Sequence, residues 1–137
     1  MKEIHPYLFL YGRCEEALNF WKDAIGGEIT MIHRYDSSPQ PVPDNFKKKI
    51  MHAEFKADDL FFMASDGKPG DKPVTDSNIA LSINFTNEGE QTTVFDKLAR
   101  GGKVEMQLQD TFWGARFGML TDKFGIYWML NFQKTPK

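Results

Sequence analysis

The sequence predicts an α+β fold made of two copies of one strand-rich unit, each with the element order βαβββ. The first observation is an internal repeat: a helix that ends at Gly26-Gly27 is matched by one that ends at Gly101-Gly102, 75 residues further on. The same offset pairs Phe20 with Phe95. The second observation is that extended apolar stretches precede each helix and follow each glycine pair. A repeat of this length indicates a duplicated supersecondary unit, and two such units usually enclose a cavity.

Local patterns predict each element of the first copy. A strand at about 4–10 precedes a helix over 14–25, in which apolar residues recur at the helical period. Glu15 and Glu16 lie in its first turn, where negative charge favours the helix dipole. Three prolines within 36–48 forbid regular structure, which predicts a surface loop. The other strands of this copy are expected at about 28–35, 49–57 and 60–65.

The second copy follows a turn-rich linker at about 66–77. Its helix is expected from about 88 to 100, with Asn87 as the N-cap and Glu90 three residues later, a pattern typical of a capping box. Its strands are expected at about 78–86, 103–108, 115–121 and 126–132. We therefore expect one domain over residues 1–137, with repeat one at about 1–66 and repeat two at about 77–137.

Composition limits the function classes. A chain of 137 residues is long enough to bury a core in one domain, and a net charge of -2 gives no electrostatic reason to expect nucleic acid. The single cysteine, Cys14, excludes an internal disulfide and fits a reducing compartment. No apolar run approaches the roughly 20 residues that cross a bilayer, and the first residues lack a signal-peptide pattern. We expect a cytoplasmic protein with no membrane partner.

Several motifs resemble one known family. They are the stretches Pro6–Gly12, Lys49–Ala53 and Gln109–Gly118, followed by the turn Thr121–Gly125. Together they resemble the PhnB-like branch of the vicinal oxygen chelate superfamily, which includes glyoxalases, extradiol dioxygenases and the fosfomycin- and bleomycin-resistance proteins. The resemblance covers essentially the whole chain. It implies a glyoxalase-like curved mixed sheet around a cavity, and a homodimer.

The resemblance also implies where a metal would be held. In the metalloenzymes of the superfamily, His, Glu or Gln ligands come from the first and fourth strands of each unit. Carried onto this sequence, those positions hold Pro6, Met63, Leu81 and Met129. None of these binds a hard or borderline cation, since a thioether suits soft ions such as Cu(I). We therefore expect that this chain retains the cavity of the superfamily but binds no metal there and no cofactor.

Strand alternation makes the expected cavity wall apolar. The predicted ligand-binding residues of this wall are Leu8, Phe61, Met63, Ile83, Tyr127 and Met129.

Polar candidates are fewer. His52 lies in the third expected strand. It could serve as a polar anchor or general base, since histidine titrates near neutrality; the alternative is a histidine with a structural hydrogen bond. Asp110, Trp113 and Arg116 lie before and within a later strand. A Trp beside an Asp and an Arg can close a pocket mouth by stacking and charge contact; the alternative is a structural turn. His52 and Asp110 are the candidate catalytic acid/base pair.

Three further groups have both a structural and a functional interpretation. Asp122 is expected to shape the turn that ends at Gly125. Cys14 lies on the apolar stripe of its helix, which favours a buried, inert thiol over one activated by the helix dipole. Ser65 and Asp66 either face the cavity mouth or begin the linker turn.

The sequence leaves three classes of function open. The preferred one is a binding protein that holds a small, largely apolar molecule without reaction, as the bleomycin-resistance members do. The alternative is a vicinal oxygen chelate enzyme of lyase, isomerase or dioxygenase type, with a divalent metal or with metal-independent acid/base chemistry. The methyltransferase label that this branch often carries is disfavoured, because no Gly-rich strand-to-helix loop is present to cradle a nucleotide. The third class is a purely structural or interaction module.

Overall fold

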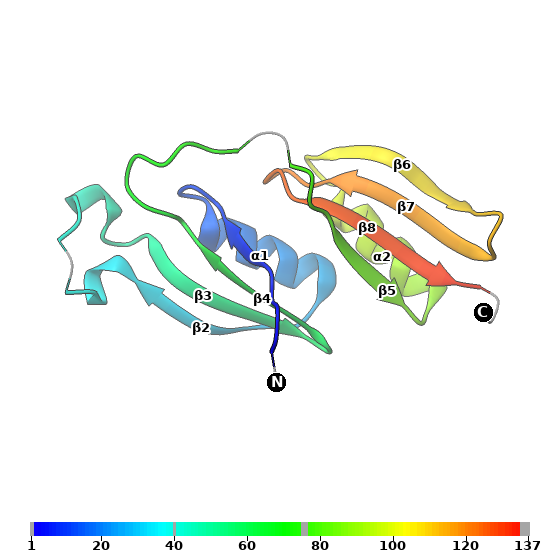
Figure 1. Ribbon diagram of the computed structural model, residues 1–137, viewed down its shortest axis with the longest axis horizontal. Coiled ribbons are helices and arrows are strands. Elements are labelled where there is room, and N and C mark those ends of the chain that lie inside the picture. The colour runs from blue at the N-terminus through cyan, green and yellow to red at the C-terminus, as the bar shows by residue number, and fades with distance from the viewer. Residues whose placement is uncertain (1, 40, 75–76, 135–137) are drawn as a thin grey trace. The chain divides into compact units, whose positions relative to one another are not determined.

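The computed structural model describes residues 2–39, 41–74 and 77–134. The chain divides into two compact units, Met1–Pro73 and Val74–Lys137, which we call unit 1 and unit 2. Each unit has the order βαβββ, which confirms the duplicated α+β fold (Figure 1). That the two units form one domain stays a prediction. No helix in the described part of the chain is both long and apolar enough to cross a membrane.

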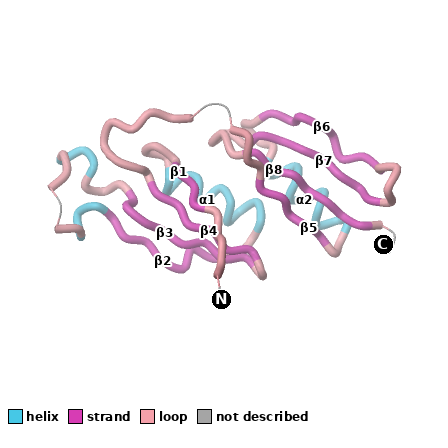
Figure 2. Tube along the Cα trace, viewed as in Figure 1, coloured by secondary structure: helices cyan, strands magenta, loops and turns pink. Residues whose placement is uncertain are grey.

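Unit 1 is a four-stranded mixed sheet with one helix. Its strands lie in the order β1-β4-β3-β2; β1 runs parallel to β4, and the other pairs are antiparallel (Figure 2). The predicted loop at 36–48 is not wholly irregular, because two short 3-10 turns form at its ends. The elements are β1 (Tyr7–Phe9), α1 (Cys14–Ile25), β2 (Glu28–Arg34), η1 (Tyr35–Ser37), η2 (Asp44–Phe46), β3 (Ile50–Ala57) and β4 (Leu60–Ser65).

Unit 2 repeats this topology, with the strand order β5-β8-β7-β6 and a parallel β5–β8 pair. The antiparallel β6–β7 and β7–β8 pairs complete the sheet. The elements are β5 (Leu81–Phe85), α2 (Glu88–Leu98), β6 (Lys103–Asp110), β7 (Ala115–Thr121) and β8 (Tyr127–Gln133).

The core of unit 1 lies between α1 and the sheet. The apolar stripe of α1 buries Trp21, whose ring meets Phe62 edge-on at 5.3 Å, and Phe62 stacks on Phe55 at 4.9 Å. The helix begins without a cap from its own N-cap residue. Instead the buried carboxylate of Asp66 accepts the N–H of Cys14 and the N–H of Ile50, each at 2.7 Å. One side chain thus satisfies the first turn of α1 and the start of β3 together.

The helix of unit 2 is capped locally, as the sequence predicts. The side chain of Asn87 accepts the N–H of Glu90 at 2.8 Å. One turn in, Gln91 is fully buried and donates to the carbonyls of Arg116 and Leu130 at 2.9 and 3.1 Å. Because these carbonyls belong to β7 and β8, Gln91 fixes α2 on its sheet.

The second glycine of each pair serves a purpose that local pattern does not reveal. Gly26 ends α1 with a φ of 86° and donates to the carbonyl of Lys22 at 2.9 Å, as expected of a helix terminus. A Cβ on Gly27 would lie 2.4 Å from the carbonyl oxygen of Lys56, and one on Gly102 would lie 2.3 Å from that of Thr121. Both glycines are required because the chain passes directly against the backbone of the sheet.

Candidate functional site

Each sheet has one face that its own helix covers; we call the opposite face the open face. In unit 1 the alternation of β3 and β4 separates the two faces clearly. Ala53, Phe55 and Ala64 are buried on the helix side. The open face carries an aromatic and sulfur-containing surface, and β3 adds an imidazole, a carboxylate and an ammonium to it. Residues of this face on β1, β3 and β4 include Tyr7, Phe9, His52, Glu54, Lys56, Phe61 and Met63.

Three of these side chains form a continuous hydrogen-bonded chain, which we call the relay. The hydroxyl of Tyr7 lies 2.9 Å from Nδ1 of His52, and Nε2 of His52 lies 3.1 Å from a carboxylate oxygen of Glu54. The side chains of His52 and Glu54 are 27% and 26% exposed, so both are accessible yet partly removed from water.

The relay has a defined direction. A carboxylate only accepts hydrogen bonds, so Nε2 of His52 carries the proton that Glu54 receives. In the neutral imidazole Nδ1 is then the acceptor, and it accepts a hydrogen bond from the hydroxyl of Tyr7. Burial raises the pKa of the Tyr7 phenol above its ordinary value, and a hydrogen bond with Ser65 partly opposes this rise. Tyr7 therefore keeps its proton at neutral pH, and its oxygen, which also interacts with the side chain of Ser65, lies on the open face.

The second copy does not repeat the relay. Strand register aligns Tyr7, Met63 and Glu54 across unit 1, and it aligns Ser82, Met129 and Met119 across unit 2. Two residues before Glu54 stands His52; two residues before Met119 stands Phe117. Since both units build the same strands, the fold itself does not require a phenol, an imidazole and a carboxylate at these places.

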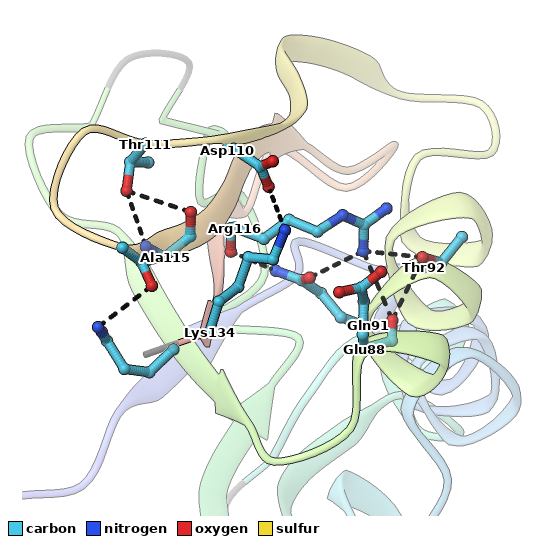
Figure 3. A network of polar contacts seen from close by, with 10 residues as sticks. Glu88, Gln91, Thr92, Asp110, Thr111, Ala115, Arg116 and Lys134 are labelled. Atoms are coloured by element: carbon cyan, nitrogen blue, oxygen red, sulfur yellow. Dashed lines mark hydrogen bonds and ion pairs between the residues drawn. The ribbon is translucent and has the colours of Figure 1, made fainter. Parts of the chain in front are cut away.

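The hairpin between β6 and β7 is held by contacts within unit 2 (Figure 3). The guanidinium of Arg116 donates to the side chains of Gln91 and Thr92 at 3.0 and 2.9 Å, and to the carbonyl of Glu88 at 3.5 Å. Thr111 closes the turn, since its hydroxyl accepts the N–H of Ala115 at 3.0 Å. Arg116 thus ties β7 to the first turn of α2.

The other two residues predicted in this region lie at the surface. Asp110 pairs with Lys134 at 2.9 Å, and Trp113 is 52% exposed, with its ring edge-on to Phe112 at 4.9 Å. Trp113 does not fill the core, and Asp110 faces an ammonium instead of capping a backbone amide. That Trp113 and Arg116 bind a ligand stays a prediction.

Comparison with known proteins shows the family to which the chain belongs. A family model described as 3-demethylubiquinone-9 3-methyltransferase matches residues 2–131. The chain belongs to this PhnB-like family.

Several proteins are similar to this PhnB-like chain in sequence or in structure. Protein YjdN of Escherichia coli K12 is 31% identical over 141 residues, which cover 96% of this chain and 95% of YjdN. The crystal structure of protein PA1353 from Pseudomonas aeruginosa is 36% identical, with a TM-score of 0.88 over 98% of this chain and all of that one. The PhnB protein of Bacillus cereus is 30% identical, with a TM-score of 0.80 over 96% and 99% of the two chains. A glyoxalase-related enzyme from Fulvimarina pelagi, at 15% identity and a TM-score of 0.64 over 96% and 88%, shares the fold. The chain is thus a PhnB-like protein that shares the fold of a glyoxalase-related enzyme.

Strand register shows which residues lie beside the two methionines at the positions predicted from the superfamily's metal ligands. Met63 is paired with Tyr7, not with Pro6, and Met129 is paired with Ser82, not with Leu81. The repeat offset of 75 residues relates Tyr7 to Ser82 as well. The four aligned open-face positions therefore hold one phenol, one hydroxyl and two thioethers. A cavity without a metal stays a prediction.

The predicted wall residues fall on both sides of their sheets. Phe61 and Met63 lie on the open face of unit 1, and Tyr127 and Met129 on that of unit 2. Leu8 and Ile83 do not lie with them, because Leu8 pairs with the buried Ala64 and Ile83 with the buried Leu130. Leu8 and Ile83 therefore do not belong to the predicted wall, since they lie on the face that the helix of their own unit covers.

The sequence misses two members of the relay. Glu54, not Asp110, is the carboxylate beside His52 in unit 1, and Tyr7 approaches it from a strand 45 residues earlier. The signal for Glu54 is present in the sequence, because residues two apart on a strand share a face. The approach of Tyr7 depends on the pairing of β1 with β4, which no local pattern predicts.

The remaining candidates are structural. Asp66 anchors α1 and β3 as described above. Asp122 shapes its turn, as expected: one carboxylate oxygen accepts the N–H groups of Phe124 and Ile126, and the other accepts the indole N–H of Trp128 at 2.9 Å. Burial, followed by the charge of Asp66, strongly raises the pKa of the Cys14 thiol. Cys14 is therefore an inert group of the core.

A cleft of about 460 Å³ opens beside the start of α1, away from the predicted wall. It contains cations, but acidic or carbonyl oxygens engage them: Arg34 pairs with Glu15 at 3.0 Å, and Lys49 donates to the carbonyl of Gly12 at 2.8 Å. The cleft is a polar feature of the surface, distinct from the relay. Its lining includes Gly12, Arg13, Glu15, Arg34, Lys49 and Asp66.

Proposed function

We propose that this PhnB-like protein binds a small molecule with substantial apolar surface on the open face of unit 1. The observation that carries the proposal is the relay, set among Phe9, Phe61 and Met63. Ligand sites are typically apolar surfaces with a few placed polar groups that fix orientation. Tyr7, which is 38% exposed, presents such a group.

Exposure supports this assignment. Phe9 is 49% exposed and its ring lies 5.2 Å from that of Tyr7. Two adjacent aromatic side chains at a sheet surface offer a stacking platform, which contributes beyond the area that it buries.

Methionine methyl NMR tests the proposal and locates the site. Labelled methyl groups report from the open face of unit 1 through Met63, and from that of unit 2 through Met129. The probe is 4-nitroanisole, a small aromatic molecule with no ionisable group. We expect a saturable shift of the Met63 signal, assigned with M63L. A titration that leaves Met63 unchanged would contradict the proposal, and saturation at Met129 alone would assign the ligand to unit 2.

Catalysis is the second candidate, and the family description gives it a specific form. It names a methyltransferase that acts on 3-demethylubiquinone. A methyl donor such as S-adenosylmethionine would then bind the chain, and calorimetric titration with that donor tests this directly. A metal-dependent reaction is tested by activity that a chelator removes and a divalent ion restores.

The assembly belongs to the same proposal. We expect a homodimer without metal, as the resemblance to the superfamily implies. Native mass spectrometry of protein purified without chelator measures the subunit count, any bound metal and any co-purified ligand together. A stoichiometric divalent ion in that spectrum would reverse the metal-free assignment.

A further inference from the structure

We infer that the relay Tyr7–His52–Glu54 binds an acidic hydroxyl group, a phenol or an enol, and takes its proton. The ligand is then held as the oxyanion. This inference rests on the proposed function, because it names the class of ligand that the open face of unit 1 would select. Three arguments carry it: the tautomer of His52 that the Glu54 carboxylate favours, the charges around His52 and the different residues at the corresponding positions of the second copy.

The direction of the relay makes the resting site an acceptor. Glu54 holds the proton on Nε2 of His52, and Nδ1 engages the proton of Tyr7. Beside its interaction with Ser65, the Tyr7 oxygen has a second lone pair, and this position favours a ligand that donates a proton. A hydroxyl is such a donor, whereas an ether or an existing anion is not.

Proton transfer along the relay reverses its polarity. The ligand hydroxyl gives its proton to the Tyr7 oxygen while the original Tyr7 proton moves to Nδ1 of His52. One O–H bond of the ligand is broken and one N–H bond of His52 is formed, and Tyr7 ends as a phenol. The ligand oxyanion then accepts a hydrogen bond from Tyr7, and the imidazolium of His52 donates to Glu54 on one side and to Tyr7 on the other.

The surroundings of His52 suit the charged product. The Glu54 carboxylate at 3.1 Å compensates the imidazolium directly, and charge-assisted hydrogen bonds are the stronger kind. Three other side chains lie near His52 on the neighbouring strands or on its own. His33 on β2 is its cross-strand partner, and β4 contributes the uncharged Met63. Lys56 follows Glu54 by two residues along β3. Tyr7 from β1 completes the set.

The repeat shows that this arrangement is not a consequence of the fold. Unit 2 forms the same sheet with Ser82, Phe117 and Met119 at the corresponding positions. If the three groups only stabilised the sheet, the apolar solution of unit 2 would serve equally in unit 1.

The test compares two probes of nearly the same shape, 4-nitrophenol and its methyl ether 4-nitroanisole, on the full chain. Phenol and phenolate forms of 4-nitrophenol differ in visible absorbance, so its ionisation is read directly. At a pH where the free probe is mostly protonated, we expect the bound probe to absorb as the phenolate. Calorimetry in buffers of different ionisation enthalpy should show that the released proton stays on the protein.

Substitutions separate the relay from general packing. We expect H52Q to bind 4-nitrophenol about tenfold more weakly or worse, the loss expected for one hydrogen bond to a charged group, and to leave it as the phenol. Binding of 4-nitroanisole should stay unchanged. H33Q is the matched control, because His33 lies on the neighbouring strand opposite His52; we expect wild-type behaviour from it.

The outcomes are distinct. Both probes bound equally, with 4-nitrophenol still protonated, would overturn the relay and leave the proposed function intact. A phenolate signal that survives H52Q would overturn the role of His52. Failure of both probes to bind at Met63 would overturn the proposed function, and this inference with it.

Discussion

Replacing Asp66 by Asn should destabilise unit 1 far more than an exposed change of the same kind. Asp66 is 2% exposed, and its two carboxylate oxygens each accept one backbone N–H at 2.7 Å. The asparagine amide keeps one acceptor and turns an NH₂ group toward the other N–H. Two donors then face each other where a carboxylate satisfied both Cys14 and Ile50.

The magnitude follows from these two contacts. Losing one hydrogen bond to a charged acceptor costs about 1.5–3 kcal/mol, and a buried donor left without an acceptor costs about 1–3 kcal/mol more. We expect the free energy of unfolding to fall by roughly 3–5 kcal/mol, a large share of the about 5–15 kcal/mol typical of a folded domain. Loss of the N–H acceptor at Cys14 should loosen the first turn of α1 in particular.

Urea unfolding followed by circular dichroism measures the total change, and hydrogen exchange read by mass spectrometry locates it. In D66N, peptides over 14–25 and 50–57 should lose protection, because those segments begin at the two affected N–H groups. D59N, in the exposed turn between β3 and β4, is the matched control and should unfold like the wild type. A D66N protein within about 0.5 kcal/mol of wild type, the range of ordinary surface changes, would refute the reasoning.

Three other expectations concern buried polar groups. D122N should cost about 1.5–3 kcal/mol, because its NH₂ group would face the indole N–H of Trp128, and thermal unfolding measures this loss; a W128F background should reduce it, and an equal loss there would show that the indole contact is not the cause. Q91L should cost about 2–4 kcal/mol, because two strand carbonyls lose their donor; unchanged stability in urea would remove Gln91 as the anchor of α2. The Cys14 thiol should resist thiol reagents until the chain unfolds. Burial raises the pKa of this thiol, so its contribution to stability is complete below the ordinary thiol pKa of about 8.5 and is lost as the pH rises above it. The stability of wild type relative to C14A should therefore be constant up to about pH 8 and fall from about pH 8.5 to pH 10; a constant difference over the whole range would contradict this.

Local chemistry made much of the fold predictable. Helix α1 spans Cys14–Ile25, as its apolar period and glycine end predict, and β7 spans Ala115–Thr121 within the expected bounds. Asn87 caps α2 because its short side chain reaches back to the first turn. These features depend on neighbours within a few residues, which the sequence displays directly.

The faces of the parallel strands were harder to predict. An error of one residue moves a whole strand's side chains to the other face, and β1 has only three residues from which to read its alternation. The prediction therefore placed Leu8 in the wall, whereas pairing with β4 puts Tyr7 on the open face beside Met63. Parallel partners lie more than 50 residues apart in this unit, so their register is a tertiary property.

Side chains that join distant segments were missed for the same reason. Asp66 was expected either at the cavity mouth or in the linker turn, because nothing near it in the sequence identifies Cys14 as its partner. His52 was recognised as a polar group in an apolar strand, but the phenol that faces it comes from β1. The sequence thus singled out polar residues that stand in apolar surroundings. Their hydrogen-bond partners were identified only from the pairing of strands in the structure.

The approach of Gly27 to Lys56, and of Gly102 to Thr121, has a consequence for how such a protein can diverge. In each unit the chain leaving the helix rests on the backbone of a strand, with no side chain between them. The distance between these two backbone segments does not depend on which side chains fill the core, provided that the glycine is retained. The two halves can therefore exchange aromatic for aliphatic packing, and a histidine for a phenylalanine on the open face, without moving the helix along its sheet. One small residue in each half is therefore a fixed point around which larger apolar side chains can change.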